Sequence, residues 1–378
     1  MKLTMFLKLH PTEQQKEVLL CTMEQFNAAC NYVSEVAFKE QTASQVKLHH
    51  LTYYAVREKF GLSAQMAVRV IGKVAETYKV DRKRLHTFKP HGAIVYDRRI
   101  LTFKFPDRVS ILTVEGRREI PFVFKNYRRL DIRRVRGQAD LVYRNHDFYL
   151  AVCVDVPEPP ADESTEWLGV DLGIVNIATD SDGESYSGAQ VNGLRKRYAK
   201  LRSKLQKKAT EKRKSGKRPK SIFRLLKKRS RKEHRFVANV NHVIARRLVG
   251  KAKDTGRGIA LENLTGIRDR ITVSKAQRYN QHSWAFRQLR TSIEYKAKLA
   301  GVPVTLVDPR DTSRTCPMCG CVDKRNRRDQ AHFRCTSCGF AGPADVIAAR
   351  NIASRAAVNR PDAATAWVSR KPLALAMG

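Results

Sequence analysis

The stretch that most constrains the fold is 167–179, WLGVDLGIVNIAT, in which apolar and β-branched residues surround a single acid, Asp171. A run of this kind, bounded by polar turns, is typical of one fully buried strand. Burying a carboxylate there costs several kcal/mol unless a positive charge compensates it, and a metal ion is the simplest compensation. The alternative is an Asp that ends a strand and caps a turn, and this stretch alone favours that alternative.

The charge of the chain indicates a polyanionic partner. Lys and Arg number 73 against 36 Asp and Glu, a formal net charge of +37 over 378 residues. Such an excess repels itself in a compact monomer. No apolar run reaches the roughly 18 residues of a membrane-spanning helix, and Met1 opens into a strand pattern rather than a signal peptide. Nucleic acid is therefore favoured over a membrane surface. The eight cysteines, four of them in CxxC pairs, suit a reducing compartment.

Before residue 157 the pattern is one strand, a helical insertion and a run of short strands. Residues 2–10 alternate apolar and polar, and Thr12 with Gln15 predicts a capping box for the first of three helices. Short strands between 92 and 156 suggest a small barrel that the first strand completes. We therefore expect a β-barrel at 1–11 and 90–157, a helical insertion at 12–89, and a Pro-rich acidic linker at 158–166.

The most basic part of the chain is 195–232, which holds 20 Lys or Arg and one acid, Glu211. Apolar residues recur in it at near-helical intervals, so we expect two basic helices around a loop at 216–219, lying against a phosphate backbone. A solvated helix face or a disordered tail is the alternative. The candidate nucleic-acid contacts are Arg195, Lys204, Lys207, Lys208, Lys227 and Lys228.

Two CxxC pairs form the most specific motif, CPMC and CTSC, with 15 residues between them. Four thiolates at this spacing predict a closed, tetrahedral zinc site of the structural kind. Cys321 and His332 lie nearby and are expected not to bind the metal. A zinc ribbon by itself says little about function. The four predicted ligands are Cys316, Cys319, Cys335 and Cys338.

Two further acids accompany Asp171 in the second half, where alternating strands and helices predict an α/β layer. Glu262 ends a strand pattern, ALE, and Asp345 follows Pro343 at the start of a predicted helix. Hydrolysis of a phosphodiester by two metal ions needs such a set of carboxylates, since Mg²⁺ prefers oxygen ligands. Three unrelated surface or capping acids are the alternative, and spacing alone does not decide between them.

At these residues the chain resembles the TnpB family, transposon-encoded relatives of the type V CRISPR effector nucleases. The matching motifs are GVDLG around Asp171, ALENL around Glu262, SRTCPMCG and FRCTSCG at the cysteine pairs, and ADVIAARNIA around Asp345, in the family's order. The resemblance is firm over about 167–353 and weaker over the N-terminal half. One departure is Ile347, where the family usually has Asn.

The resemblance implies an RNA-guided DNA endonuclease in the cytoplasm of a bacterial or archaeal cell, associated with the nucleoid. Its partners would be a guide RNA from the transposon end and double-stranded target DNA. Asp171, Glu262 and Asp345 would be the catalytic triad holding two Mg²⁺ ions, and the four cysteines would hold one Zn²⁺. The alternatives are a nuclease-inactive RNA-guided DNA-binding regulator and a transposase accessory protein.

The same resemblance implies the architecture. A wedge β-barrel interrupted by a helical recognition lobe would precede a RuvC-like, ribonuclease H-like α/β nuclease domain with an inserted zinc ribbon. The implied boundaries are 167–310 and 343–356 for the nuclease domain, 311–342 for the ribbon and 357–378 for a loosely ordered tail.

Overall fold

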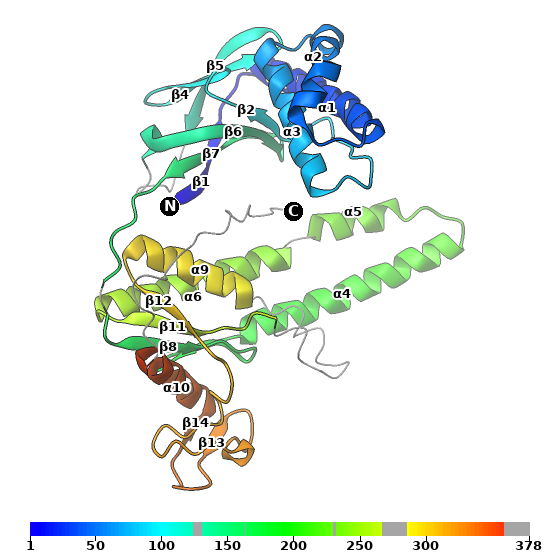
Figure 1. The fold of residues 1–378 in the computed structure, drawn as a ribbon. Helices are drawn as coiled ribbons and strands as arrows, with labels where there is room; N and C mark the ends of the chain where they lie inside the picture. The colour runs from blue at the N-terminus through cyan, green and yellow to red at the C-terminus, as the bar shows by residue number, and fades with distance from the viewer. Residues whose placement is uncertain (124–130, 163, 230–231, 267–285, 359–378) are drawn as a thin grey trace. The chain divides into compact units, whose positions relative to one another are not determined.

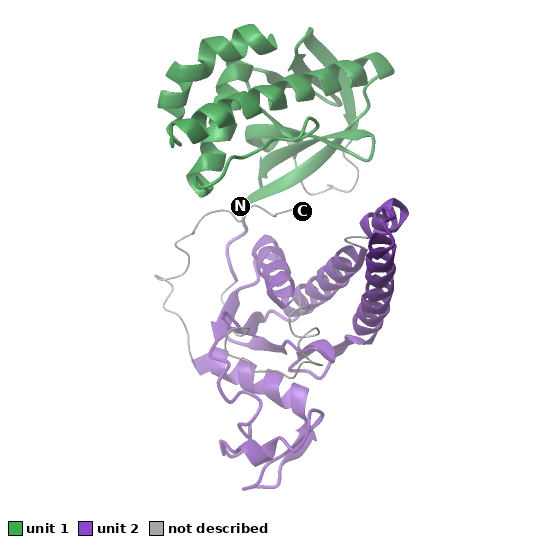
Figure 2. Ribbon diagram, turned by 90° about the vertical axis from the view of Figure 1, so that its right-hand side faces the viewer, with its two compact units in different colours: residues 1–157 green, residues 158–378 purple. Residues whose placement is uncertain are grey.

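The chain forms two compact units, Met1–Pro157 and Glu158–Gly378 (Figures 1 and 2). The division falls where the predicted linker begins. The structure, a computed structural model, describes residues 1–123, 131–162, 164–229, 232–266 and 286–358. Within these ranges, no helix combines the length and the apolar composition that crossing a membrane requires.

Unit 1 is built on a seven-stranded antiparallel sheet in the order β2-β6-β7-β1-β5-β4-β3. The first strand, β1 (Lys2–Leu9), is paired on both sides by strands from much later in the chain, β7 (Asp147–Asp155) and β5 (Gly116–Val123). The other strands are β2 (Ile94–Tyr96), β3 (Leu101–Lys104), β4 (Arg108–Thr113) and β6 (Val135–Arg144).

The two edge strands of this sheet, β2 and β3, are joined by a single tight turn. The carbonyl of Asp97 accepts hydrogen bonds from the backbone amides of Ile100 and Leu101. The buried Tyr96 hydroxyl donates to the Leu112 carbonyl of β4 at 3.0 Å. The sheet therefore curls until its edges meet at one end, which is the curvature that a small barrel needs.

Three helices are inserted after β1: α1 (Glu13–Lys39), α2 (Gln45–Phe60) and α3 (Ala64–Val80). The predicted capping box is present, since Thr12 and Gln15 each accept a hydrogen bond from the other's backbone amide. Gly61 ends α2 with a φ of +61°. The apolar stripes of the helices share one hydrophobic core with the sheet.

Unit 2 is built on a five-stranded mixed sheet in the order β10-β9-β8-β11-β12. The central strand, β8 (Trp167–Asp171), is antiparallel to β9 (Asn176–Asp180), which pairs with β10 (Ser185–Ser187). On its other side β8 is parallel to β11 (Gly258–Glu262), which is parallel to β12 (Val304–Val307). The predicted α/β layer is therefore present.

The prediction of one strand over 167–179 is wrong, because β8 and β9 divide this stretch. The chain reverses between Asp171 and Asn176, and a Cβ on Gly173 would lie 2.6 Å from the Asn176 carbonyl oxygen. The glycine therefore permits a turn that is too tight for any side chain. The turn residues 172–175, LGIV, are as apolar as the strand before them, so composition conceals the turn.

Helices cover both faces of this sheet (Figure 1). Leu168 and Val170 of β8 pack against α6 (Lys232–Asp254) and α9 (Phe286–Ala300). Gly169 points to the opposite face, where an added Cβ would collide with the Ala349 carbonyl of α10 (Ala344–Val358). The apolar spacing over 283–299 predicts a helix, which corresponds to α9, and 283–285 lie outside the described ranges. The helix α10 continues past the predicted start of the tail at 357, and 359–378 are not described.

The predicted basic helices are α4 (Ala189–Lys214) and α5 (Lys220–Arg229), here named the basic hairpin. Ala209 and Ile222 are buried, and the Arg213 guanidinium lies 5.0 Å from the centre of the Phe223 ring. A smaller element between β12 and α10 holds the CxxC pairs, with a 3-10 turn η2 (Lys324–Asn326) and two strands, β13 (His332–Arg334) and β14 (Ala341–Pro343).

Candidate active site and zinc site

The structure brings the three predicted acids together at one edge of the unit 2 sheet. Asp171 is the last residue of β8 and Glu262 the last residue of β11. These strands are parallel neighbours, with Val170 opposite Leu261, so their carboxyl ends share an edge. Asp345 lies in the first turn of α10, the helix packed beneath both strands. Ligands of open α/β sheets bind outside the carboxyl ends of strands.

The Asp171 carboxyl group interacts electrostatically with both other acids. Burial raises the pKa of its carboxyl group to about 7, and the negative charges of Glu262 and Asp345 contribute to that rise. The Arg327 guanidinium and the backbone amide of Leu172 oppose it by stabilising the carboxylate. A half-buried acid with a pKa near neutrality beside two like charges is a site that favours a bound cation.

Glu262 is only 8% exposed, and burial raises the pKa of its carboxyl group. The Thr312 hydroxyl opposes this rise by donating a hydrogen bond to Oε1 at 2.5 Å. The positive charges of Arg355 and Arg327 also favour the ionised form.

Asp345 is held by two side chains that the sequence analysis did not select. Asn176 of β9 donates from Nδ2 to Oδ2 at 3.0 Å, and Arg327 Nη2 lies 3.4 Å from Oδ1. Asn176 stands five residues after Asp171 in the same conspicuous stretch, which is a signal that could have found it. Arg327 lies in the run KRNRR, where nothing separates it from its basic neighbours.

The four cysteines form a compact metal-type cluster. Their sulfur atoms all lie within 4.8 Å of one another, and no other His, Cys, Asp and Glu group within the described ranges gathers this closely. Backbone amides of Ser337 and Cys338 donate to Cys335 Sγ, which lowers the pKa of that thiol. Four thiolates with amide support fit tetrahedral zinc. Cys321 and His332 are outside the cluster, and His332 instead faces Asp329 at 2.9 Å.

Ile347, the departure from the family pattern, has a packing role. Its side chain is 1% exposed and joins the small core of the cysteine-bearing element, with Cys316, Phe333 and Cys335. It stands one turn or less from Asp345 on α10. This residue therefore anchors the start of the acid-bearing helix to the predicted zinc ribbon.

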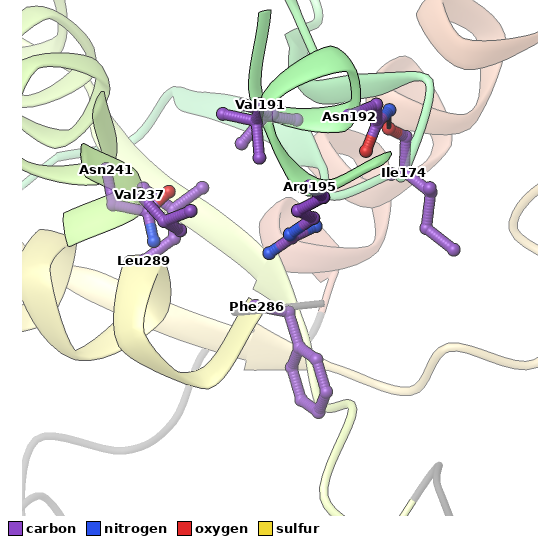
Figure 3. Close-up of a pocket in the computed structure, with 10 residues that line it drawn as sticks. Ile174, Val191, Asn192, Arg195, Val237, Asn241, Phe286 and Leu289 are labelled. Atoms are coloured by element: carbon purple, nitrogen blue, oxygen red, sulfur yellow. Dashed lines mark hydrogen bonds between the residues drawn. The ribbon is translucent and has the colours of Figure 1, made fainter. Parts of the chain in front are cut away.

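Five of the six candidate nucleic-acid contacts are exposed on the basic hairpin, and Arg195 is not. Arg195, labelled in Figure 3, is 4% exposed. Its guanidinium lies 3.6 Å from the Glu233 carboxylate of α6. It lines a cavity of about 20 Å³ with Val191, Val237 and other residues, room for about one water molecule. The prediction for Arg195 is wrong, because the first turns of α4 pack against α6. The exposed members are Lys204, Lys207, Lys208, Lys227 and Lys228.

A larger cavity, about 250 Å³, lies in unit 1. Phe103 and Phe105 line it with nearly parallel rings 6.1 Å apart, and Arg98 and Arg133 are exposed beside it. Aromatic faces next to guanidinium groups are typical of surfaces that stack nucleobases.

Two family models match the second half of the chain. Residues 151–264 match the model described as "Probable transposase" (OrfB_IS605), and residues 286–352 match "Cas12f1-like, TNB domain". The first range contains Asp171 and Glu262, and the second contains the four cysteines and Asp345.

Curated relatives match part of the chain. The TnpB-like protein MJ0751 of Methanocaldococcus jannaschii is 34% identical over 160 residues, which is 42% of this chain and 55% of that protein. The CRISPR-associated endodeoxyribonuclease Cas12f1 of Syntrophomonas palmitatica is 34% identical over 195 residues, which is 49% of this chain and 38% of that protein. The chain thus spans about half or less of the length of these relatives.

Among solved structures, the mini-RNA-guided endonuclease CRISPR-Cas_phi3 is similar over nearly the whole chain. The TM-score is 0.53 at 12% identity, covering 96% of this chain and 93% of that one. At this identity the likeness shows a shared fold alone. By the two family models and these relatives, the chain is similar to TnpB-like and Cas12f proteins over part of its length.

Proposed function

We propose that the protein is an RNA-guided DNA endonuclease of transposon origin that cuts DNA by metal-assisted hydrolysis. The observation that carries this proposal is the convergence of Asp171, Glu262 and Asp345 at the carboxyl edge of the sheet, with the Asp171 pKa raised to about 7. Three acids that repel one another in a partly buried site are stabilised by a divalent cation.

The donor set fits magnesium. All three candidate ligands offer carboxylate oxygens, which hard cations prefer, and no thiolate or imidazole is among them. Two Mg²⁺ ions held there would supply an activated water and stabilise the leaving oxygen of the phosphodiester. The chain's own contribution is to hold the acids in place. Asn176 orients the Asp345 carboxylate, and the Arg327 guanidinium reduces the repulsion among the three acids.

We propose a RuvC-like, ribonuclease H-like nuclease domain in unit 2, with a structural Zn²⁺ on Cys316, Cys319, Cys335 and Cys338. Unit 1 would then be the wedge barrel with its recognition helices. The guide RNA and target DNA would lie along the exposed lysines of the basic hairpin, since a net charge of +37 favours a polyanionic partner. Base pairing would supply target specificity, and the protein would read a short adjacent motif.

The test is cleavage of a DNA matched to the guide that co-purifies with the protein, identified by sequencing that RNA. Asp171→Asn, Glu262→Gln and Asp345→Asn should each lower the cleavage rate at least about 10³-fold, since losing a metal ligand costs several kcal/mol at about 1.4 kcal/mol per tenfold. Binding of RNA and DNA should persist. Asp254→Asn, at an exposed acid near the end of α6, is the matched control.

Each alternative has its own outcome in this experiment. Guided DNA binding by the wild-type protein, with no cutting in Mg²⁺, would mean a nuclease-inactive regulator. Joined DNA ends would mean a transposase. Wild-type cleavage rates in all three acid variants would refute the catalytic assignment.

A further inference from the structure

Three hydrogen bonds link the buried carboxylate of Glu262, the segment that begins at Thr312 and the helix α10. The Thr312 hydroxyl donates to Glu262 Oε1, and the Thr312 carbonyl accepts from Asn351 Nδ2 at 2.8 Å. The same Nδ2 donates to the carbonyl of Thr315 at 2.7 Å. Glu262, Thr312 and Asn351 are 8%, 3% and 5% exposed. Buried hydrogen bonds of this kind fix side-chain orientation, because each lost partner leaves a costly unpaired group.

We infer that Thr312 and Asn351 are positioning residues that hold the Glu262 carboxylate for metal binding. This role belongs to the proposed active site, so it rests on the proposed function. The acids themselves are not its subject: the two residues touch neither substrate nor metal, and they act through Glu262.

A hydroxyl is well suited to this position. It occupies one oxygen of the carboxylate without bringing a positive charge that would compete with a cation. Within the described ranges, Thr312 is the side chain that donates a hydrogen bond to Glu262, and the bond is to Oε1. The single hydroxyl proton has a second acceptor within reach, the Pro309 carbonyl at 3.2 Å, but the carboxylate is nearer at 2.5 Å. The Thr312 hydroxyl therefore donates to the Glu262 carboxyl group, and the Pro309 carbonyl is the longer contact.

The backbone around Thr312 is fixed by α10. Asn351 holds the carbonyls of Thr312 and Thr315, and Arg355, one turn later, donates to the carbonyls of Asp308 and Arg310. Residues four apart lie on the same face of a helix, so one face of α10 donates hydrogen bonds to the backbone of the segment 308–315.

The preceding residue, Asp311, shows that this segment is held in a demanding conformation. Its φ is +55°, in the left-handed region that non-glycine residues rarely adopt. The backbone amides of Arg314 and Thr315 donate to its carbonyl and stabilise the turn. A turn restrained at this many points places the Thr312 hydroxyl within narrow limits.

Two catalytic positions therefore depend on one helix. α10 carries Asp345 in its first turn and orients Glu262 through Asn351, about two turns later. Thr315 directly precedes Cys316, so the hydrogen bond from Asn351 also fixes the backbone beside the first CxxC pair.

The test compares three substitutions at Thr312 in the full-length protein with its RNA. Thr312→Val keeps the shape and removes the hydroxyl. Thr312→Ser and Thr312→Ala lose the same methyl group and differ only in the hydroxyl, so that pair separates hydrogen bonding from packing. Asn351→Asp replaces the amide donor by an acceptor at equal size. Thr305→Val, on β12 of the same sheet, is the control.

The first readout is Mn²⁺ binding measured by electron paramagnetic resonance without DNA, which needs no turnover. The second is the dependence of the cleavage rate on Mg²⁺ concentration. Partners behind metal ligands typically contribute 10- to 100-fold in affinity or activity. Thr312→Val, Thr312→Ala and Asn351→Asp should weaken Mn²⁺ binding and raise the half-saturating Mg²⁺ concentration by about 10-fold or more. Thr312→Ser should restore both to near the wild-type values.

Equal Mn²⁺ binding by wild type, Thr312→Ser and Thr312→Ala would overturn the positioning role while leaving the proposed nuclease intact. Slower cleavage with unchanged metal binding would also overturn it, because the effect would not pass through Glu262. A wild-type protein that neither binds Mn²⁺ nor cleaves would refute the proposed function and the positioning role together.

Discussion

Replacing Asp171 by Asn should stabilise the protein while abolishing cleavage. The Asp171 carboxyl has a pKa of about 7 in the folded chain against 3.8 for the free side chain, because burial and two neighbouring acids disfavour its charge. From about pH 4 to about pH 7 the unfolded chain has released a proton that the folded chain retains. The free energy of unfolding therefore falls as pH rises through this window, and the cost is complete above pH 7.

The magnitude follows from the shift. Each pKa unit is worth about 1.4 kcal/mol, so ionising Asp171 costs at most about 4 kcal/mol above pH 7. Because the side chain is partly exposed, solvent reduces this figure. Between pH 5 and pH 8 the free energy of unfolding of the wild-type protein should fall by up to about 3 kcal/mol through this group, and that of the Asp171→Asn variant should not show this fall.

Urea unfolding followed by tryptophan fluorescence measures this difference. None of the three tryptophans falls within residues 1–157, and Trp167 is the first residue of β8, so its fluorescence reports on the unit 2 sheet. The buffer contains neither Mg²⁺ nor a chelator, which leaves bound zinc in place. Adding Mg²⁺ should then stabilise the wild-type protein and not the variant.

Asp182→Asn is the control of opposite sign. The Asp182 carboxylate pairs with Arg257 at 2.7 Å and Lys251 at 3.0 Å, which lowers its pKa. Its stabilising contribution is present at pH 5 and at pH 8, so this variant should be less stable at both. If Asp171→Asn shows the wild-type stability at pH 8 and the wild-type pH slope, the carboxylate is not destabilising and the reasoning fails.

Three further results are expected. Replacing Cys316 and Cys319 together by Ser should remove bound zinc, measured by elemental analysis, and destabilise unit 2, because metal binding contributes folding free energy; reduced wild-type protein without zinc would contradict this. Lys251→Met should lower the free energy of unfolding in urea by about 3–5 kcal/mol, because it leaves the buried Asp180 carboxylate without its cation. In the wild-type protein this carboxylate lies 2.5 Å from the Lys251 ammonium and is fully buried. Adding Asp180→Asn should recover part of the loss. RNA affinity should fall steeply as salt concentration rises, and replacing the exposed hairpin lysines by Gln should flatten that dependence. A dependence unchanged by the substitutions would refute a phosphate-binding role for Lys204, Lys207, Lys208, Lys227 and Lys228.

The sequence predicts well what short-range chemistry decides. The Thr12–Gln15 capping box and the short strands that accompany β1 in unit 1 follow from local patterns, and the structure contains them. The CxxC spacing likewise places four sulfur atoms in one cluster. Composition does not distinguish one long strand from two strands joined by a tight turn. The apolar stretch at 167–179 was predicted as the first and is the second.

Long-range packing decides the rest. Arg195 has the same composition around it as the exposed lysines, and only the docking of α4 on α6 buries it. Arg327 and Asn176 reach Asp345, and Thr312 reaches Glu262, from separate parts of the chain, so no spacing rule selects them. Spacing alone left the role of the three acids open, and the motifs around them selected Asp171, Glu262 and Asp345 through the family resemblance. In the structure each acid ends a strand or lies in the first turn of a helix, positions that converge in an α/β layer.

The strand order of unit 2 also sets a sequence of events during synthesis. β8 pairs on one side with β9, which follows it at once, and on the other side with β11, whose residues leave the ribosome about 90 positions later. One hydrogen-bonding edge of the central strand therefore stays open while the basic hairpin and α6 are made, and long-range parallel pairing is slow. Asp345 emerges later still, after both cysteine pairs. A nascent chain thus carries its most basic segment before its third acid, and the carboxylate cluster is complete only after both cysteine pairs have been made.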